Sequence, residues 1–301
     1  MKTAWLERLR RQCPELDVQE QESMARHTSF RIGGPALAMA FPKSEHALSE
    51  VLRFAKNESI SPLILGAGTN VLARDEGVDG LVICLRDGLT ELTLLEGHRV
   101  LAGAGVSMAH AAVFACEEGL SGLEFAHGIP GTVGGGVFMN AGAYGGEIRQ
   151  VAVETTAMDA DGALHTYCGE EQGFGYRTSA FQSLGQIIVR TVFQLTPGNP
   201  VEIRAKMQEL ASRRRASQPL NYPSAGSTFK RPAGGYAAAL IEQAGLKGLR
   251  VGGVSVSEKH AGFLINDQGG TCADVLELIR TVQERVYAYS GIQLEPEVRL
   301  I

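Results

Sequence analysis

Long apolar runs are missing from the 301-residue sequence, which has no stretch of about 18 apolar residues that could cross a bilayer as a helix. Residues 1–12, MKTAWLERLRRQ, show the pattern of an amphipathic helix and lack the apolar segment of a signal peptide. We therefore expect a protein that works in the cytoplasm and has no membrane partner.

Cysteine is scarce and scattered. The five residues are odd in number and far apart, and they form no C-x-x-C pair: Cys13, Cys84, Cys116, Cys168 and Cys272. This spacing argues against a disulfide framework and against a structural zinc site, and the sequence predicts no metal. We expect buried, reduced thiols.

An excess of positive charge is also missing. The formal net charge is −5, so composition gives no reason to expect a nucleic-acid partner. The balance is uneven, because residues 1–197 carry 15 basic and 23 acidic side chains whereas residues 198–301 carry 13 and 10. The net charge of +3 in the last third favours an anionic ligand there, and a chance fluctuation explains it equally well.

Glycine, by contrast, is abundant, with 37 residues. There is no G-x-y period and proline numbers only 11, which excludes collagen, and 44% hydrophobic with 20% charged residues excludes a disordered chain. The glycines therefore belong to a folded protein. They indicate tight turns or main chain that approaches something closely.

The hydrophobic pattern predicts a mixture of short strands and helices. Thr196–Pro200, with two prolines and a glycine, is the clearest linker, and a weaker boundary is expected near residues 87–98. Strands are expected over 62–65, 81–85, 99–102, 151–158 and 186–195, helices after Ser44 and over 107–118, 200–215 and 272–289, and an extended segment over 294–301.

Two glycine-rich loops stand out. Gly66 and Gly68 directly follow an expected strand, where several N–H groups could surround one phosphate, although a plain structural turn explains this loop as readily. Residues 128–146 contain eight glycines in nineteen positions, which fits main chain against a flat or diphosphate ligand, or two consecutive tight turns. Neither loop is a Rossmann fingerprint or a P-loop.

The two loops, LGAGTN and GIPGTVGGGVFMNAGAYG, resemble those of an FAD-binding domain of the vanillyl-alcohol-oxidase type. Nearly the whole chain is similar to the UDP-N-acetylenolpyruvoylglucosamine reductase (MurB) family, in its shorter class without an inserted tyrosine-bearing loop. His27 stands where the family often has Asn or Tyr. Five ordered motifs carry the likeness: HTSFRIGGPA (27–36), YRTSAF (176–181), AGSTFK (225–230), KHAGF (259–263) and LEPEV (294–298).

The resemblance implies an α+β fold with three parts. Residues 1–90 and 91–197 would be the two subdomains of the FAD-binding domain, and 198–301 a C-terminal α+β substrate-binding domain. It also implies non-covalent FAD, with its diphosphate at the first loop and its ring system near the second. The cofactor-binding residues carried over are Gly66, Gly68, Thr69, Asn70, Arg74, Ile129, Pro130, Gly131, Thr132, Val133, Gly134, Asn140 and Gly142.

The family reaction implies that NADPH reduces FAD and that UDP-N-acetylglucosamine enolpyruvate is then reduced to UDP-N-acetylmuramate, a step of peptidoglycan precursor synthesis. The resemblance implies that Arg177 is the fixed cation, Ser227 the proton donor and Glu297 the group that orients the intermediate. A guanidinium suits the first role, because it stays charged and binds a carboxylate through two hydrogen bonds. Lys230, three residues after Ser227, is hypothesised to assist that serine electrostatically.

Substrate contacts are expected from Tyr176, Arg177, Arg214, Lys230 and His260. The choice of Arg214 among Arg213–Arg215 is open, because the helix dipole alone favours basic residues at a helix end. The preference for NADPH over NADH is also open, and the family suggests a monomer. Weaker candidates are Arg31, Gln218, Asn266 and Tyr144, and His127 has no assigned role.

Two other functions remain possible on sequence grounds. The same fold could serve an FAD oxidase acting on an alcohol or hydroxy acid, which would not require AGSTFK and LEPEV beside YRTSAF. A non-enzymatic flavin or nucleotide-sugar binding protein would need neither Ser227 nor Glu297.

Overall fold

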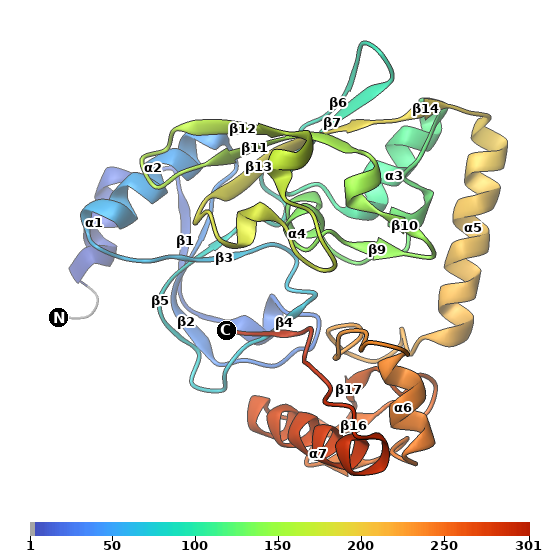
Figure 1. The fold of residues 1–301 in the computed structure, drawn as a ribbon. Helices are drawn as coiled ribbons and strands as arrows, with labels where there is room; N and C mark the ends of the chain where they lie inside the picture. The colour runs from blue at the N-terminus through green and yellow to red at the C-terminus, as the bar shows by residue number, and fades with distance from the viewer. Residues whose placement is uncertain (1–3) are drawn as a thin grey trace. The chain divides into compact units, whose positions relative to one another are not determined.

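The computed structural model describes residues 4–301, which form an α+β fold (Figure 1). The chain divides into two compact units, each built from separate stretches. Unit 1 contains the residues up to Glu20 together with Ala38–Ala67 and Gly80–Ser212, and unit 2 contains Gln21–Leu37, Gly68–Asp79 and Arg213–Ile301. The three-part division expected from the sequence stays a prediction.

Unit 1 contains a five-stranded antiparallel sheet with the order β12-β11-β13-β7-β6. Its central strand β13 pairs with β11 and β7, and helix α4 lies against β7 and β13. β-branched and apolar residues such as Val189 and Phe193 bury one side of β13 in the core. The bounds are β6 Leu92–Leu95, β7 Arg99–Gly103, β11 Ala152–Met158, β12 Leu164–Cys168, β13 Ile187–Gln194 and α4 Val133–Phe138.

A four-stranded sheet has the order β1-β2-β5-β3, and its strands β3 and β5 are parallel. Helices α2 and α3 begin at Ser44 and Ser107, whose hydroxyls accept hydrogen bonds from the backbone N–H groups three residues on. The bounds are α1 Ala4–Gln12, β1 Asp17–Ser23, β2 Pro35–Phe41, α2 Glu45–Asn57, β3 Leu63–Leu65, β5 Val78–Cys84 and α3 Met108–Glu117.

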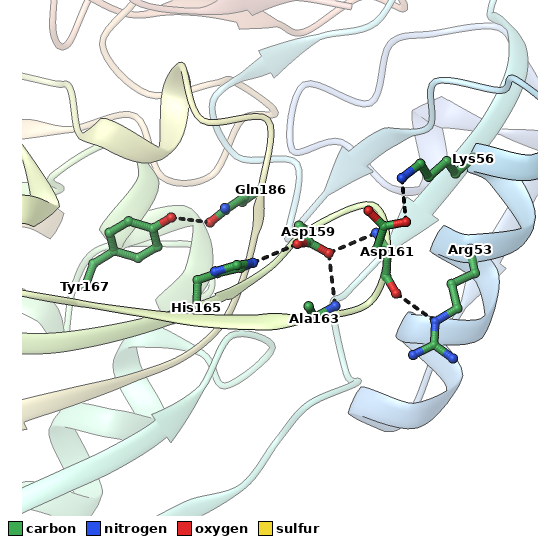
Figure 2. Close-up of polar contacts among 8 residues, drawn as sticks. All are labelled: Arg53, Lys56, Asp159, Asp161, Ala163, His165, Tyr167 and Gln186. Atoms are coloured by element: carbon green, nitrogen blue, oxygen red, sulfur yellow. Dashed lines mark hydrogen bonds and ion pairs between the residues drawn. The ribbon is translucent and has the colours of Figure 1, made fainter.

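The turn between β11 and β12 is tied to α2 (Figure 2). Asp159 accepts hydrogen bonds from the backbone N–H groups of Asp161 and Ala163 and lies 2.7 Å from Nε2 of His165. The His165 hydrogen bond, followed by the backbone N–H groups, lowers the pKa of the Asp159 carboxyl. Arg53 donates to the Asp161 carbonyl at 2.7 Å, so this hairpin is fixed against the helix.

Unit 2 contains a three-stranded antiparallel sheet, β15-β16-β17, and the long helix α7. Thr271 and Asp274 form a capping box at the start of α7, Asp75 accepts from the first N–H groups, and Gly291 ends the helix at φ +70°. The bounds are β4 Val71–Leu72, α6 Ala237–Gln243, β15 Arg250–Val251, β16 Val254–Val256, β17 Leu264–Asn266, α7 Cys272–Ser290 and β18 Arg299–Leu300. Helix α5, Pro200–Ser217, belongs to unit 1 up to Ser212 and to unit 2 from Arg213.

The main elements predicted from the sequence are confirmed, including the helix within residues 1–12, although residues 1–3 lie outside the described range. Two interpretations are wrong. The second glycine loop contains a helix, α4, and Cys168 is exposed although the other four cysteines are buried. Among residues 4–301 no helix is long and apolar enough to span a membrane, and no cluster of potential metal ligands occurs there.

Candidate functional site

The first and second glycine loops meet inside unit 1. A Cβ atom on Gly66, the residue after β3, would lie 2.7 Å from Oγ1 of Thr132. Thr132 is the N-cap of α4, where its hydroxyl accepts a hydrogen bond from the N–H of Gly135. Two motifs that are 66 residues apart in the sequence are therefore in contact, and this contact leaves room only for glycine at the first.

Part of the glycine density is explained by packing of the chain on itself. A Cβ on Gly134 would lie 2.9 Å from Cβ of Ala104, and one on Gly136 would lie 2.7 Å from Sδ of Met108. The N–H of Gly134 also donates to the Ala104 carbonyl at 2.9 Å. These glycines let α4 lie directly on the segment after β7, so a bound ligand is not needed to explain them.

The second loop is accessible both before and after the buried part of α4, and its segment before α4 offers mainly main chain. Pro130 is exposed and Gly131, at φ +140°, is partly exposed, whereas Thr132, Val133 and Gly134 are buried. Ile129 is half-buried, and its N–H donates to the Ala126 carbonyl. Before α4 the loop thus offers main chain to a ligand, whereas after α4 it also exposes the Tyr144 side chain.

His127, whose sequence context indicates no role, lies immediately before this loop. Its Nδ1 atom is buried and has no hydrogen-bond partner within residues 4–301. An orphaned buried polar atom costs free energy unless a ligand or water satisfies it. Together with the contact between Gly66 and Thr132, this atom fits a polar cofactor such as FAD beside the second loop.

Asn140 has partners within the protein. It is fully buried at φ +42°, and its Nδ2 donates to Oε2 of Glu147 at 3.0 Å and to the Gly175 carbonyl at 2.8 Å. Its Oδ1 accepts from the N–H of Arg149 at 3.0 Å. With both amide hydrogens used, the Asn140 side chain holds the segment before Arg177, and its contact with the cofactor stays a prediction.

Arg177 lies at the tip of a tight turn in unit 1. Gly175 and Thr178 exchange backbone hydrogen bonds of 3.0 and 3.3 Å across this turn, and Arg177 adopts φ +53°, a conformation that non-glycine residues rarely take. Its guanidinium lies 5.3 Å from the ring centroid of Tyr176 and donates to the Gly142 carbonyl at 3.3 Å. The two predicted substrate residues and Gly142 are therefore neighbours.

The rest of the first glycine loop belongs to unit 2. Gly68 has φ +63°, and a Cβ there would lie 2.0 Å from the His27 carbonyl oxygen. Asn70 donates from Nδ2 to the Glu297 carbonyl at 3.3 Å, and its own carbonyl accepts from the N–H of Arg299 at 3.0 Å. Thr69 beside it is half-buried. This loop is thus fastened to the last segment of the chain.

Arg74 follows β4 with an exposed side chain. Its N–H donates to the Ile301 carbonyl at 2.9 Å, and its own carbonyl accepts from the N–H of Gly34 at 2.9 Å. The main chain of Arg74 therefore has a structural role, while the residue itself is exposed and accessible to a ligand.

Ser227 and Glu297 lie on adjacent extended segments of unit 2. The N–H of Glu297 donates to the Thr228 carbonyl at 2.7 Å, and Phe229 pairs with Pro296. On its other side the serine segment pairs with Phe263. Ser227 is exposed and Glu297 is half-exposed, so both side chains are accessible to a ligand.

Lys230 has a different partner from the one hypothesised. Its Nζ lies 3.2 Å from Oε2 of Glu295, and both side chains are largely exposed. An exposed ion pair of this kind contributes little to stability. The hypothesis that Lys230 assists Ser227 directly receives no support from this geometry.

His260 is held as a neutral ring. The N–H of Gly262 donates to its Nδ1 at 3.2 Å, which leaves the ring proton on Nε2, and burial lowers the pKa of the imidazole. The ring also packs edge-on against Phe263, the residue paired with Ser227. His260 therefore presents a hydrogen-bond donor beside the serine segment.

The basic end of α5 is linked to the KHAGF motif, which also contains His260. Lys259 donates from Nζ to the Arg215 carbonyl at 2.5 Å, and Arg214 is half-buried. Nearby in the sequence, Oε1 of Gln218 is buried without a partner among the described residues. Of the three expected catalytic residues, Ser227 and Glu297 are thus brought together in unit 2, while Arg177 belongs to unit 1.

Two family models match the chain. The model described as "UDP-N-acetylenolpyruvoylglucosamine reductase, C-terminal domain" matches residues 218–301, and the model described as "FAD binding domain" matches residues 36–167. These ranges contain Ser227 and Glu297 in the first case and both glycine loops in the second.

Curated relatives extend the likeness over the whole chain. A UDP-N-acetylenolpyruvoylglucosamine reductase of Agathobacter rectalis is 45% identical over 100% of this chain and 99% of that protein, and one of Streptococcus thermophilus is 43% identical over 98% and 97%. The crystal structure of the reductase from Thermus caldophilus has a TM-score of 0.81 at 36% identity and covers 95% of this chain and 98% of that one. The chain therefore belongs to the UDP-N-acetylenolpyruvoylglucosamine reductase (MurB) family, and it is an FAD-dependent oxidoreductase.

Proposed function

We propose that this protein catalyses the NADPH-dependent reduction of UDP-N-acetylglucosamine enolpyruvate to UDP-N-acetylmuramate, as a cytoplasmic monomer in peptidoglycan precursor synthesis. The observation that carries the proposal is the hydrogen bond between the segments of Ser227 and Glu297, in a chain whose relatives are named as this reductase. A carbanion that must be protonated needs a proton donor and a group that fixes its geometry, and these two side chains supply both.

FAD is proposed to bind without a covalent bond through the main chain of the two glycine loops. The orphaned Nδ1 of His127 supports a polar ligand at the second loop, and the exposed main chain near Pro130 supports close approach. When bound, FAD supplies hydride transfer from the nicotinamide to the double bond. The residues proposed to hold it are Gly66, Gly68, Thr69, Asn70, Arg74, Ile129, Pro130, Gly131, Thr132, Val133, Gly134 and Gly142, with Asn140 acting through its contact with Gly175.

Three side chains are proposed to act on the substrate. The guanidinium of Arg177 binds the carboxylate and stabilises the negative charge that develops next to it. Ser227 donates its hydroxyl proton to the carbon centre, and Glu297 orients the intermediate. A serine hydroxyl is a weak acid, so its acceptor must be strongly basic and shielded from water.

Substrate binding is proposed to involve Tyr176, Arg214, Lys230 and His260. Arg214 and Lys230 supply positive charge for the diphosphate, and the neutral His260 donates from Nε2. Because Gly262 occupies Nδ1 of His260 and burial lowers its pKa, this contact should stay unchanged across neutral pH.

The decisive experiment is NADPH oxidation by the purified protein, with and without UDP-N-acetylglucosamine enolpyruvate. We expect a yellow preparation and substrate-dependent loss of NADPH absorbance. A colourless protein that gains no flavin spectrum with added FAD would contradict the cofactor assignment. A rate of NADPH oxidation that is the same with and without the enolpyruvyl substrate would reject the proposed reductase activity. NADH in place of NADPH settles the preference that the sequence leaves open.

A further inference from the structure

The turn that carries Arg177 is strained and is held from several sides. The positive φ of Arg177 costs conformational energy, so neighbouring contacts must fix it. One contact is the hydrogen bond from Asn140 to the Gly175 carbonyl, which fixes the start of the turn. Others come from the residues that follow the turn.

Gln182 fixes the other end. Its Nε2 donates to the Arg177 carbonyl at 3.1 Å and to the Phe138 carbonyl at 2.9 Å. Phe138 is the last residue of α4, where a carbonyl has no partner within the helix, and Ser179 donates to the same oxygen at 2.8 Å. One amide group therefore joins the end of α4 to the main chain of the arginine itself.

We propose that Gln182 is a positioning residue for the reduction, which holds the Arg177 main chain so that its guanidinium stays where the substrate carboxylate binds. This inference rests on the proposed role of Arg177. Gln182 acts through Arg177 and need not contact the substrate. Its Nε2 donates to both carbonyls and also lies 3.7 Å from Sδ of Met139, and an isosteric carboxylate or a thioether has no N–H group that could replace these donors.

The test is the variant Gln182→Met, which keeps a long side chain but removes both N–H donors. We expect full flavin content and near-normal reduction of the flavin by NADPH. The single-turnover oxidation of the reduced flavin by the enolpyruvyl substrate should slow by about 10–100-fold, because a displaced charge loses most of its effect. Ser183→Ala is the matched control, since its exposed hydroxyl bonds only the Ala180 carbonyl among the contacts described, and it should remain within about twofold of wild type.

A double-mutant comparison separates positioning from a general structural role. In an Arg177→Lys background, Gln182→Met should add less than about a twofold loss, because the guanidinium that Gln182 positions is already gone. An equal loss in both backgrounds, or an unchanged substrate reaction in the single variant, would overturn the proposal. If Gln182→Met loses its flavin, the same two backgrounds are compared with Gln182→Glu, whose side chain has the same shape but no N–H donors. A wild-type protein that does not react with the substrate would instead refute the proposed function.

Discussion

The side-chain amide of Asn70 donates a hydrogen bond to the main-chain carbonyl of Glu297 at 3.3 Å. Next to it, the Asn70 carbonyl accepts from the N–H of Arg299 at 3.0 Å, where β4 and β18 begin to pair. Asn70, which is expected to bind the cofactor, is thus bonded through both its side chain and its main chain to the segment that carries Glu297, the proposed catalytic carboxylate. The first glycine loop and Glu297 should therefore be ordered together.

Asn70→Ala tests this coupling. Loss of one neutral hydrogen bond should lower turnover by about two- to tenfold even at saturating FAD, because Glu297 is then less well fixed. Flavin affinity is measured by fluorescence titration, and turnover is measured over a range of FAD concentrations. If excess FAD restores the wild-type rate completely, Asn70 serves the cofactor alone.

Helices and strands with strong local signals could be predicted from the sequence. Ser44 and Ser107 cap α2 and α3, Pro200 begins α5, and the apolar faces of these elements are buried as their periodicity indicates. β1 has no sequence signal, because its sequence DVQEQES is almost entirely polar and most of its side chains are exposed. Its conformation depends on the neighbouring strand rather than on its own residues.

Helix α4 could not be predicted for a different reason. Three of its six residues are glycine, which locally disfavours a helix. The contacts of Gly134 and Gly136 with Ala104 and Met108 decide its structure, and those partners lie about 30 residues away in the sequence. Tertiary packing therefore overrides local propensity here.

The candidate site also combines residues that have a sequence signal with residues that only long-range contacts identify. Motif order identified Ser227 and Glu297, and the structure adds that their segments are hydrogen-bonded neighbours. The contacts of Asn140 and Gln182 with the Arg177 turn carry no sequence signal, because an Asn after a methionine or a Gln after a phenylalanine is unremarkable alone. Only the long-range hydrogen bonds reveal them.

Gly68→Ala should lower the free energy of unfolding far more than Gly269→Ala does. Both glycines have similar φ angles, +63° and +67°, so each substitution costs about 1–2 kcal/mol of backbone strain. At Gly68 the new Cβ would also lie 2.0 Å from the His27 carbonyl, whereas Gly269 faces open space. Urea unfolding should show a loss of about 2–5 kcal/mol for Gly68→Ala. Equal losses in the two variants would show that the close contact is relieved without cost.

Cys168 should be the thiol that reacts first. It is exposed at the end of β12, whereas burial raises the pKa of the Cys272 thiol to about 11. A thiol with that pKa is ionised to about 0.1% at pH 8, and the thiolate is the reactive form. We expect a chromogenic disulfide reagent to titrate one thiol rapidly in the native protein and none in Cys168→Ser. Rapid reaction of the Cys168→Ser protein would show that a buried cysteine is accessible.

The ion pair of Arg250 and Asp267 should make stability depend on pH in the acid range. Arg250 donates to both carboxylate oxygens of Asp267, at 2.8 and 2.6 Å, and this contact lowers the pKa of the Asp267 carboxyl in the folded protein. A depressed carboxyl pKa adds stability above the unfolded value of about 3.9, and that stability is lost as the pH falls through the folded pKa.

Asp267→Asn should therefore reduce the free energy of unfolding near pH 7 by about 1–2 kcal/mol, a figure kept small because the Arg250 side chain is 35% exposed. Urea unfolding between pH 8 and pH 3.5 should give a constant difference from wild type down to about pH 5 and a shrinking one below about pH 4. Asp161→Asn is the control, because the Asp161 side chain is 67% exposed and its pair with Lys56 should contribute less than about 0.5 kcal/mol. A difference that grows toward acid would mean that the Asp267 carboxyl is destabilised, not stabilised, by folding.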